Sequence, residues 1–123
     1  MPESHRDNAA ELLGMLGASG LAPLRLAGRA LLPIVQGGMG VGISAHRLAG
    51  SVAALGAVGT ISSIDLRRHH PDLMERTRDL APGAAATLAA KLAIDEANLE
   101  ALAREIRAAR VLSGGGGVCW PST

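Results

Sequence analysis

The chain has 123 residues, which is enough for one small domain or for part of a larger one. Its apolar fraction of 48% excludes a disordered polymer, its net charge of +1 argues against nucleic-acid or anionic-membrane partners, and a single cysteine excludes an internal disulfide. The opening residues do not resemble a signal peptide and no apolar run approaches the roughly 20 residues of a membrane span, so we expect a cytoplasmic protein.

Residues 1–30 are predicted to form an N-terminal helix and a connecting segment. Asn8 and Glu11 have the spacing of a capping box, and three leucines on one helical face follow them. Gly17 is a suitable helix end, and residues 20–28 are interpreted as connecting chain.

Residues 31–61 predict a strand, a glycine-rich turn, a helix and a second strand. The run LLPIVQ at 31–36 is apolar throughout, as in the buried strands of parallel sheets. GGMGVG follows at 37–42, Ser44 is the expected N-cap of the helix, and Gly56 is its expected C′ residue. Residues 57–61 form a second apolar run, so we expect a βαβ unit with two adjacent parallel strands.

Residues 62–112 predict a polar loop and two helices. Pro71 is suited to the first position of a short helix, which Pro82-Gly83 would end. From residue 84 the pattern is helical, and we expect its packing face to be the stripe Leu88, Leu92, Leu99, Leu102, Ile106 and Ala109.

Two kinds of site, a P-loop and a metal site, are not expected in the loop and the glycine-rich turn. Ile43 stands where a P-loop needs lysine, which excludes that motif. A metal site of His69 and His70 with nearby aspartates is not expected, because adjacent side chains diverge. His46 is expected to be exposed, and no residue is assigned a catalytic role.

The glycine-rich turn also matches a dinucleotide-binding fingerprint. Residues 40–45 read G-x-G-x-x-A between a predicted strand and a predicted helix. In that interpretation Asp65 would bind the ribose, which requires it to lie at the end of the second strand and face the turn.

A longer stretch, 32–74, resembles the nitronate monooxygenase family, also called the 2-nitropropane dioxygenases. The most specific piece is QGGM at 36–39, followed by GAVGTISS at 56–63 and ANLEALAREIRAAR at 97–110. The resemblance implies an α/β fold, the N-terminal βαβα portion of a flavin-binding TIM (β/α)8 barrel, within 31–112. It also implies an FMN-dependent oxidoreductase that oxidises small alkyl nitronates with O2.

By the same resemblance, Gly37, Gly38 and Met39 would contact FMN, largely through backbone groups, and Ser62 is a further cofactor-binding candidate. A complete barrel needs about 250 residues, and the family's catalytic histidine and phosphate-binding loops lie beyond the matched region. We therefore expect an incomplete, inactive barrel with weak or absent FMN binding.

The last residues, 113–123, are expected to be an atypical tail from a shifted reading frame or a truncated gene. Residues 118–120 are too few for the apolar third strand with which the family continues, and Pro121 would interrupt the ladder of a central strand. Three alternatives to the nitronate monooxygenase reading stay open: a fragment of an FMN-dependent enoyl reductase-type barrel, a Rossmann nucleotide-binding fragment, and a non-catalytic remnant.

Overall fold

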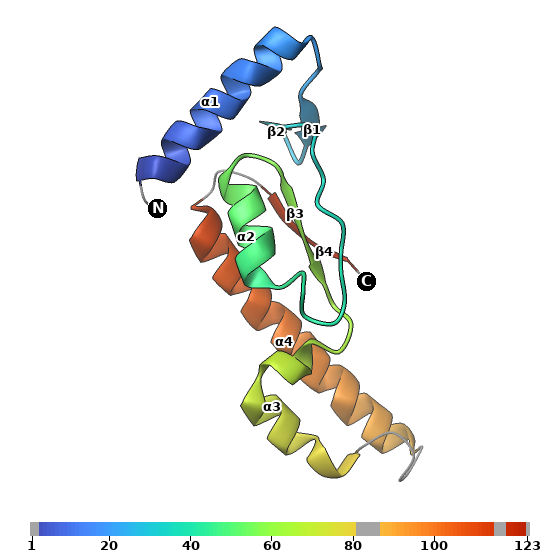
Figure 1. The fold of residues 1–123 in the computed structure, drawn as a ribbon. Helices are drawn as coiled ribbons and strands as arrows, with labels where there is room; N and C mark the ends of the chain where they lie inside the picture. Colours follow the sequence, from blue (N-terminus) through green and yellow to red (C-terminus); the bar gives the residue numbers. More distant parts are fainter. Residues whose placement is uncertain (1–2, 81–86, 115–117, 123) are drawn as a thin grey trace.

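The computed structural model describes residues 3–80, 87–114 and 118–122 and has a mixed α/β structure (Figure 1). This confirms the expected α/β class. The predicted helix break at Pro82-Gly83 lies outside the described residues. No helix in the described part of the chain is long and apolar enough to cross a lipid bilayer.

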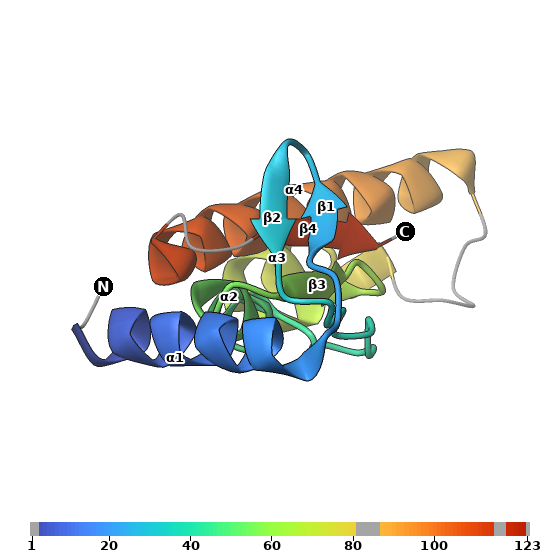
Figure 2. The same ribbon diagram turned by 90° about the horizontal axis from the view of Figure 1, so that it is seen from above.

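The N-terminal region consists of helix α1, Glu3–Ser19, and a β-hairpin of β1, Leu24–Leu26, and β2, Arg29–Leu31. Helix α1 begins before Asn8, so the capping-box prediction is wrong; no glycine or proline between Glu3 and Asn8 stops the helix from starting earlier. The hairpin lies where connecting chain was predicted. In Figure 2, α1 and α4 run along opposite sides of α2.

The two predicted strands of the βαβ unit do run parallel, but the first forms only in part. Strand β3, Val58–Ser62, is buried along its whole length. Val35 forms a parallel bridge with Val58, in which Gln36 N donates to Val58 O at 2.9 Å and Val58 N donates to Ile34 O at 3.0 Å. Pro33 shortens the ladder because it has no N–H to donate.

The expectation that residues 118–120 are too few for a strand is wrong, because residues 118–122 form one, while the origin of the tail stays a prediction. Strand β4, Val118–Ser122, pairs in parallel with β3, with Val58 opposite Val118 and Ile61 opposite Pro121. A proline is compatible with a strand that has a free edge, and β4 pairs only with β3 in the described part of the chain. Segment 32–36, β3 and β4 therefore follow one another across the sheet in sequence order.

Helices α2, His46–Ala54, and α4, Leu88–Ser113, pack against each other beside this sheet (Figure 1). The helix approaches the strand closely at Gly59, where an added Cβ would lie 1.9 Å from the Ala49 carbonyl oxygen. Gly56, at φ +88°, follows the end of α2 as predicted.

The buried face of α4 differs from the predicted leucine stripe. Leu88, Leu92 and Leu99 are 71%, 58% and 66% exposed. Small residues are buried instead, because α2 can approach α4 closely only where side chains are short; the buried residues of α4 are Ala90, Ala97, Ala101, Glu105, Ala109 and Ser113. Of the predicted stripe, Ala109 is buried, and Leu102 and Ile106 pack against the core.

The connection between β3 and α4 contains the short helix α3, Pro71–Arg76, between two 3-10 turns, Leu66–His69 and Arg78–Leu80. Pro71 occupies the start of α3, as predicted. Leu66 and Leu73 are fully buried and join the core formed with Ala49 and Ile61.

Candidate functional site

The glycine-rich turn lies at the carboxyl end of the two parallel segments. It follows Gln36 directly, and Ser62 N, at the end of β3, donates to Ser44 O at 3.0 Å. The position of a Cβ added to Gly40 would be 3.5 Å from Ser62 Oγ. The structure therefore brings the predicted contacts Gly37, Gly38, Met39 and Ser62 to one edge of the sheet.

The side chain of Gln36 connects this turn to β3. Its Oε1 accepts a hydrogen bond from Thr60 N at 3.0 Å, and its Nε2 donates to Ser44 Oγ at 2.8 Å and to Gly37 O. One amide group thus fixes the strand, the start of the turn and its far end relative to one another.

Ser44 closes the turn. The prediction that it caps α2 is wrong. Ser44 is fully buried, and Met39 N donates to its Oγ at 2.9 Å while its own N donates to Met39 O at 3.0 Å. Helix α2 begins at His46 with Ala45 as N-cap, one residue too late for the Ser44 hydroxyl to serve the helix.

The outer surface of the turn is apolar and carries free backbone donors. An added Cβ on Gly37 would meet nothing within 4 Å. Within the described part of the chain, the N–H groups of Gly37, Gly38 and Gly40 have no hydrogen-bond acceptor. The turn also carries exposed apolar side chains, and Ile64 lies next to Gly40; the exposed residues are Met39, Val41, Ile43 and Ile64.

Two residues support the turn from below and from the side. Ser62 is only 4% exposed, so it packs under the turn, whereas Ile64 beyond it is 61% exposed. The His69 ring lies against Gly42, where an added Cβ would be 1.4 Å from Nε2. Gly42 has a φ of +70°, a conformation that favours glycine.

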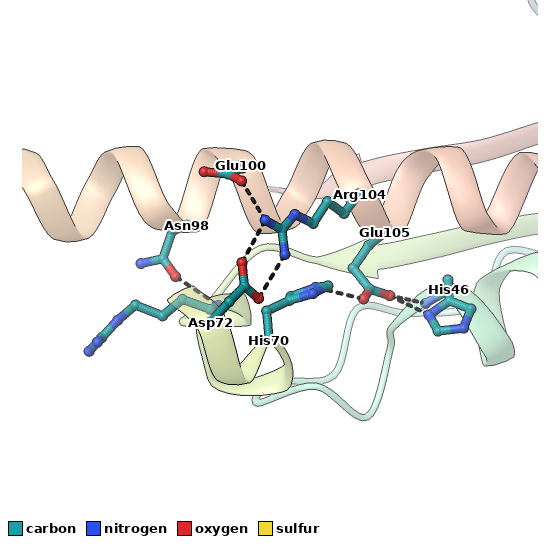
Figure 3. Close-up of polar contacts among 8 residues, drawn as sticks. His46, His70, Asp72, Asn98, Glu100, Arg104 and Glu105 are labelled. Atoms are coloured by element: carbon teal, nitrogen blue, oxygen red, sulfur yellow. Dashed lines mark hydrogen bonds and ion pairs between the residues drawn. The ribbon is translucent and has the colours of Figure 1, made fainter. Parts of the chain in front are cut away.

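A second polar group surrounds Glu105, a buried carboxylate on α4 (Figure 3). Glu105 Oε2 accepts from His46 N at 2.7 Å and lies 2.6 Å from His46 Nδ1. Its Oε1 lies 3.0 Å from His70 Nε2. His46 is therefore paired and half-buried, which corrects the expectation that it is exposed.

Glu105 acts as the cap of α2 from a distant part of the chain. Burial raises the pKa of the Glu105 carboxyl, but the hydrogen bonds from the His46 backbone and ring outweigh it, so the pKa lies below its ordinary value. The first N–H of α2 thus has an ionised acceptor, which the helix dipole also favours.

A surface network connects α3 to α4 next to this group. Arg104 donates to both carboxylate oxygens of Asp72, at 2.9 and 2.8 Å, and to Glu100 at 2.5 Å (Figure 3). The Arg104 hydrogen bonds lower the pKa of Asp72. This pairing links α3 to α4 close to His70, the residue before α3.

The aspartate required by the dinucleotide interpretation lies three residues beyond the end of β3 and is paired with two arginines. Asp65 Oδ1 accepts from Arg67 Nε at 2.9 Å, and Oδ2 accepts from Arg68. Burial raises the pKa of Asp65, but these two arginines lower it by more. Within the described residues, no group of three or more histidine, cysteine, aspartate or glutamate side chains could bind a metal ion.

Sequence reasoning gave no role to Gln36 or Glu105, and it placed Arg67 in a solvated loop, whereas Arg67 is buried. A detectable signal existed for Glu105, because it falls four residues from Ala101 and from Ala109 in a stripe of small residues. A charge at such a position indicates a buried partner on the facing element. Gln36 had no such signal, because its partners depend on the turn geometry.

Comparison with protein-family models gives no match for this chain. Comparisons with curated proteins and with solved structures also give none.

Proposed function

We propose that this chain forms the first βα units of an FMN-dependent nitronate monooxygenase-like barrel, in which the turn at 37–39 supports the flavin ring. The observation that carries the proposal is the turn itself: a glycine surface with free amide donors at the carboxyl end of parallel strands. In barrel enzymes, sites are built at this end of the strands.

The residues present fit the ring of a flavin. The open space above Gly37 lets a flat ring approach the backbone, and the free amides can donate to polar atoms at the ring edge. Met39, 44% exposed, and Ile64, 61% exposed, can supply apolar contact beside the turn. Three parallel segments in sequence order also agree with consecutive barrel strands.

The proposal assigns separate roles to the chain and to the cofactor. Bound FMN would accept electrons from the nitronate and pass them to O2. The chain would orient the ring through the amides of Gly37 and Gly38, while Gln36 and Ser44 keep those amides in place. Ser62 supports the turn from below.

The dinucleotide-binding alternative has less support. A pyrophosphate would need the N-terminus of α2, but the Glu105 carboxylate already accepts the His46 N–H there. A second negative charge at that position would be repelled. Asp65 is paired with two arginines and would have to leave them to bind a ribose.

The test is a titration of the full chain with FMN and with riboflavin, followed by backbone amide NMR. We expect weak binding that shifts the amide signals of Gly37, Gly38 and Met39. Riboflavin should give the same shifts, because the turn is proposed to bind the ring and not the phosphate. If millimolar flavin leaves these signals unchanged, or shifts only signals elsewhere, the proposed function is wrong.

A matched pair of glycine variants sharpens this test. Gly37→Leu should abolish the shifts, because the open space above the backbone is filled while the fold tolerates the side chain. Gly14→Leu, at an equally open position on α1, should leave flavin binding unchanged.

A further inference from the structure

A cleft of about 520 Å³ lies along the connection between β3 and α4, away from the glycine-rich turn. It is lined by Arg67, Arg68, Pro71, Met74, Glu75, Thr77 and Arg78. We propose that this cleft, called here the Arg67 cleft, binds the phosphate group of a small organic phosphomonoester. None of its lining residues belongs to the proposed flavin surface.

Arg67 is the central observation, because its guanidinium is buried and incompletely paired. The side chain is only 8% exposed. Nε donates to Asp65 at 2.9 Å, and Nη1 donates to Thr77 Oγ1 at 2.7 Å and contacts Met74 Sδ at 3.7 Å. These contacts fix the plane of the guanidinium before any ligand binds.

The remaining nitrogen of Arg67, Nη2, has no hydrogen-bond partner among the described residues. It is also not sealed off from solvent. Arg67 lines the cleft, and the proposal places this free donor at the cleft wall. A buried, preoriented cation with a free N–H is suited to an oxyanion.

Two exposed arginines add positive charge at the rim. Arg68 contacts Asp65 through Nε, and Arg78 contacts Glu75 through one terminal nitrogen, so other N–H groups of both side chains stay available. The site therefore combines three guanidiniums with two carboxylates and retains a net positive charge. This charge favours a phosphate dianion over a single carboxylate.

The size and apolar wall of the cleft indicate what the phosphate is attached to. A volume of about 520 Å³ exceeds a phosphate group and falls within the usual range for small-molecule sites. Pro71 and Met74 supply apolar surface next to the arginines. A phosphomonoester with a small apolar or aromatic group would use both features.

The experiment compares phenyl phosphate, inorganic phosphate and benzoate in calorimetric and NMR titrations of the full chain. Phenyl phosphate should bind more tightly than inorganic phosphate, benzoate should bind least, and the shifted signals should come from the Arg67 cleft. Equal or tighter binding of benzoate would overturn the phosphate assignment, and phosphate-induced shifts confined to other arginines would overturn the site. The flavin titration with riboflavin, which carries no phosphate, is unaffected by either result.

Variants of the rim keep the proposal testable without disturbing Arg67 and its packing. Glu75→Gln frees Arg78 and should tighten phenyl phosphate binding by about two- to fivefold, a gain that misfolding cannot produce. Arg78→Gln should weaken binding by about three- to tenfold. Arg107→Gln, at an exposed arginine on α4, is the control, and unchanged affinity in both rim variants relative to it would refute the proposal.

Discussion

Removing the buried carboxylate of Glu105 should destabilise the chain more than any surface change on α4. In Glu105→Ala, the first N–H of α2 loses a charged acceptor at 2.7 Å, and the His46 and His70 rings lose their shared partner. A hydrogen bond to a charged group contributes about 1.5–3 kcal/mol, and loss of a helix cap costs about 0.5–2 kcal/mol. These effects overlap, so we expect a loss of about 2–3 kcal/mol in the free energy of unfolding.

Glu105→Gln separates the charge from the hydrogen bond. Its amide oxygen can still accept from His46 N, so the loss at pH 7 should be about 1 kcal/mol. The folded-state pKa of Glu105 lies below its ordinary value of 4.5. The contribution of the carboxylate is therefore fully present above that value and is lost as the pH falls through the lower, folded-state pKa.

Urea unfolding followed by far-UV circular dichroism measures both effects. The stability difference between the native chain and Glu105→Gln should shrink as the pH falls below about 4.5, through the lowered pKa of Glu105. Glu96→Gln, at an exposed position on the same helix, should change stability by less than about 0.5 kcal/mol. If Glu105→Ala is no more destabilising than Glu96→Gln, the capping role assigned to Glu105 is wrong.

Thermal unfolding tests three further predictions. Gly59→Ala should destabilise by about 3 kcal/mol or more, because its Cβ would lie 1.9 Å from the Ala49 carbonyl, and near-native stability would show that α2 does not pack there. Ala27→Asn should stabilise by about 0.5–1 kcal/mol, because Ala27 has a φ of +50° in the hairpin turn, and a loss would argue against this turn. Leu99→Ala should change stability by less than about 1 kcal/mol, because the side chain is 66% exposed, and a larger loss would restore the leucine stripe as the packing face.

The sequence predicted the position of the glycine-rich turn but not all of the contacts that hold it. The residues of this turn are consecutive, so the sequence alone indicated a turn between a strand and a helix at 37–42. The role of Ser44 was misjudged, because a serine near a helix start usually serves the helix. The observed start at His46 lets the hydroxyl accept from Met39 instead. Whether Ser44 caps the helix or the turn depends on a shift of one residue in the start of α2. Helix propensities do not locate a helix start that finely.

The sequence by itself predicted the start of α3, the end of α2 and the buried strand β3. Each of these features depends on residues within the element or directly next to it. Pro71 starts α3 because its φ is already helical and it has no N–H to leave unpaired. Gly56 ends α2 because it accepts a φ of +88° without steric cost. The buried strand at 58–62 followed from its apolar run, because a strand covered on both faces needs apolar residues throughout.

Tertiary structure decided which surfaces meet. Leucine spacing marked one face of α4, yet the helix buries its alanines, because close approach of α2 at Gly50 leaves room only for short side chains. The same approach brings Glu105 to the start of α2, 59 residues away in the chain. Strand β4 likewise pairs with β3 across a separation of 60 residues despite its proline. These contacts join residues that are far apart in the sequence. The local sequence pattern around each residue therefore does not predict them.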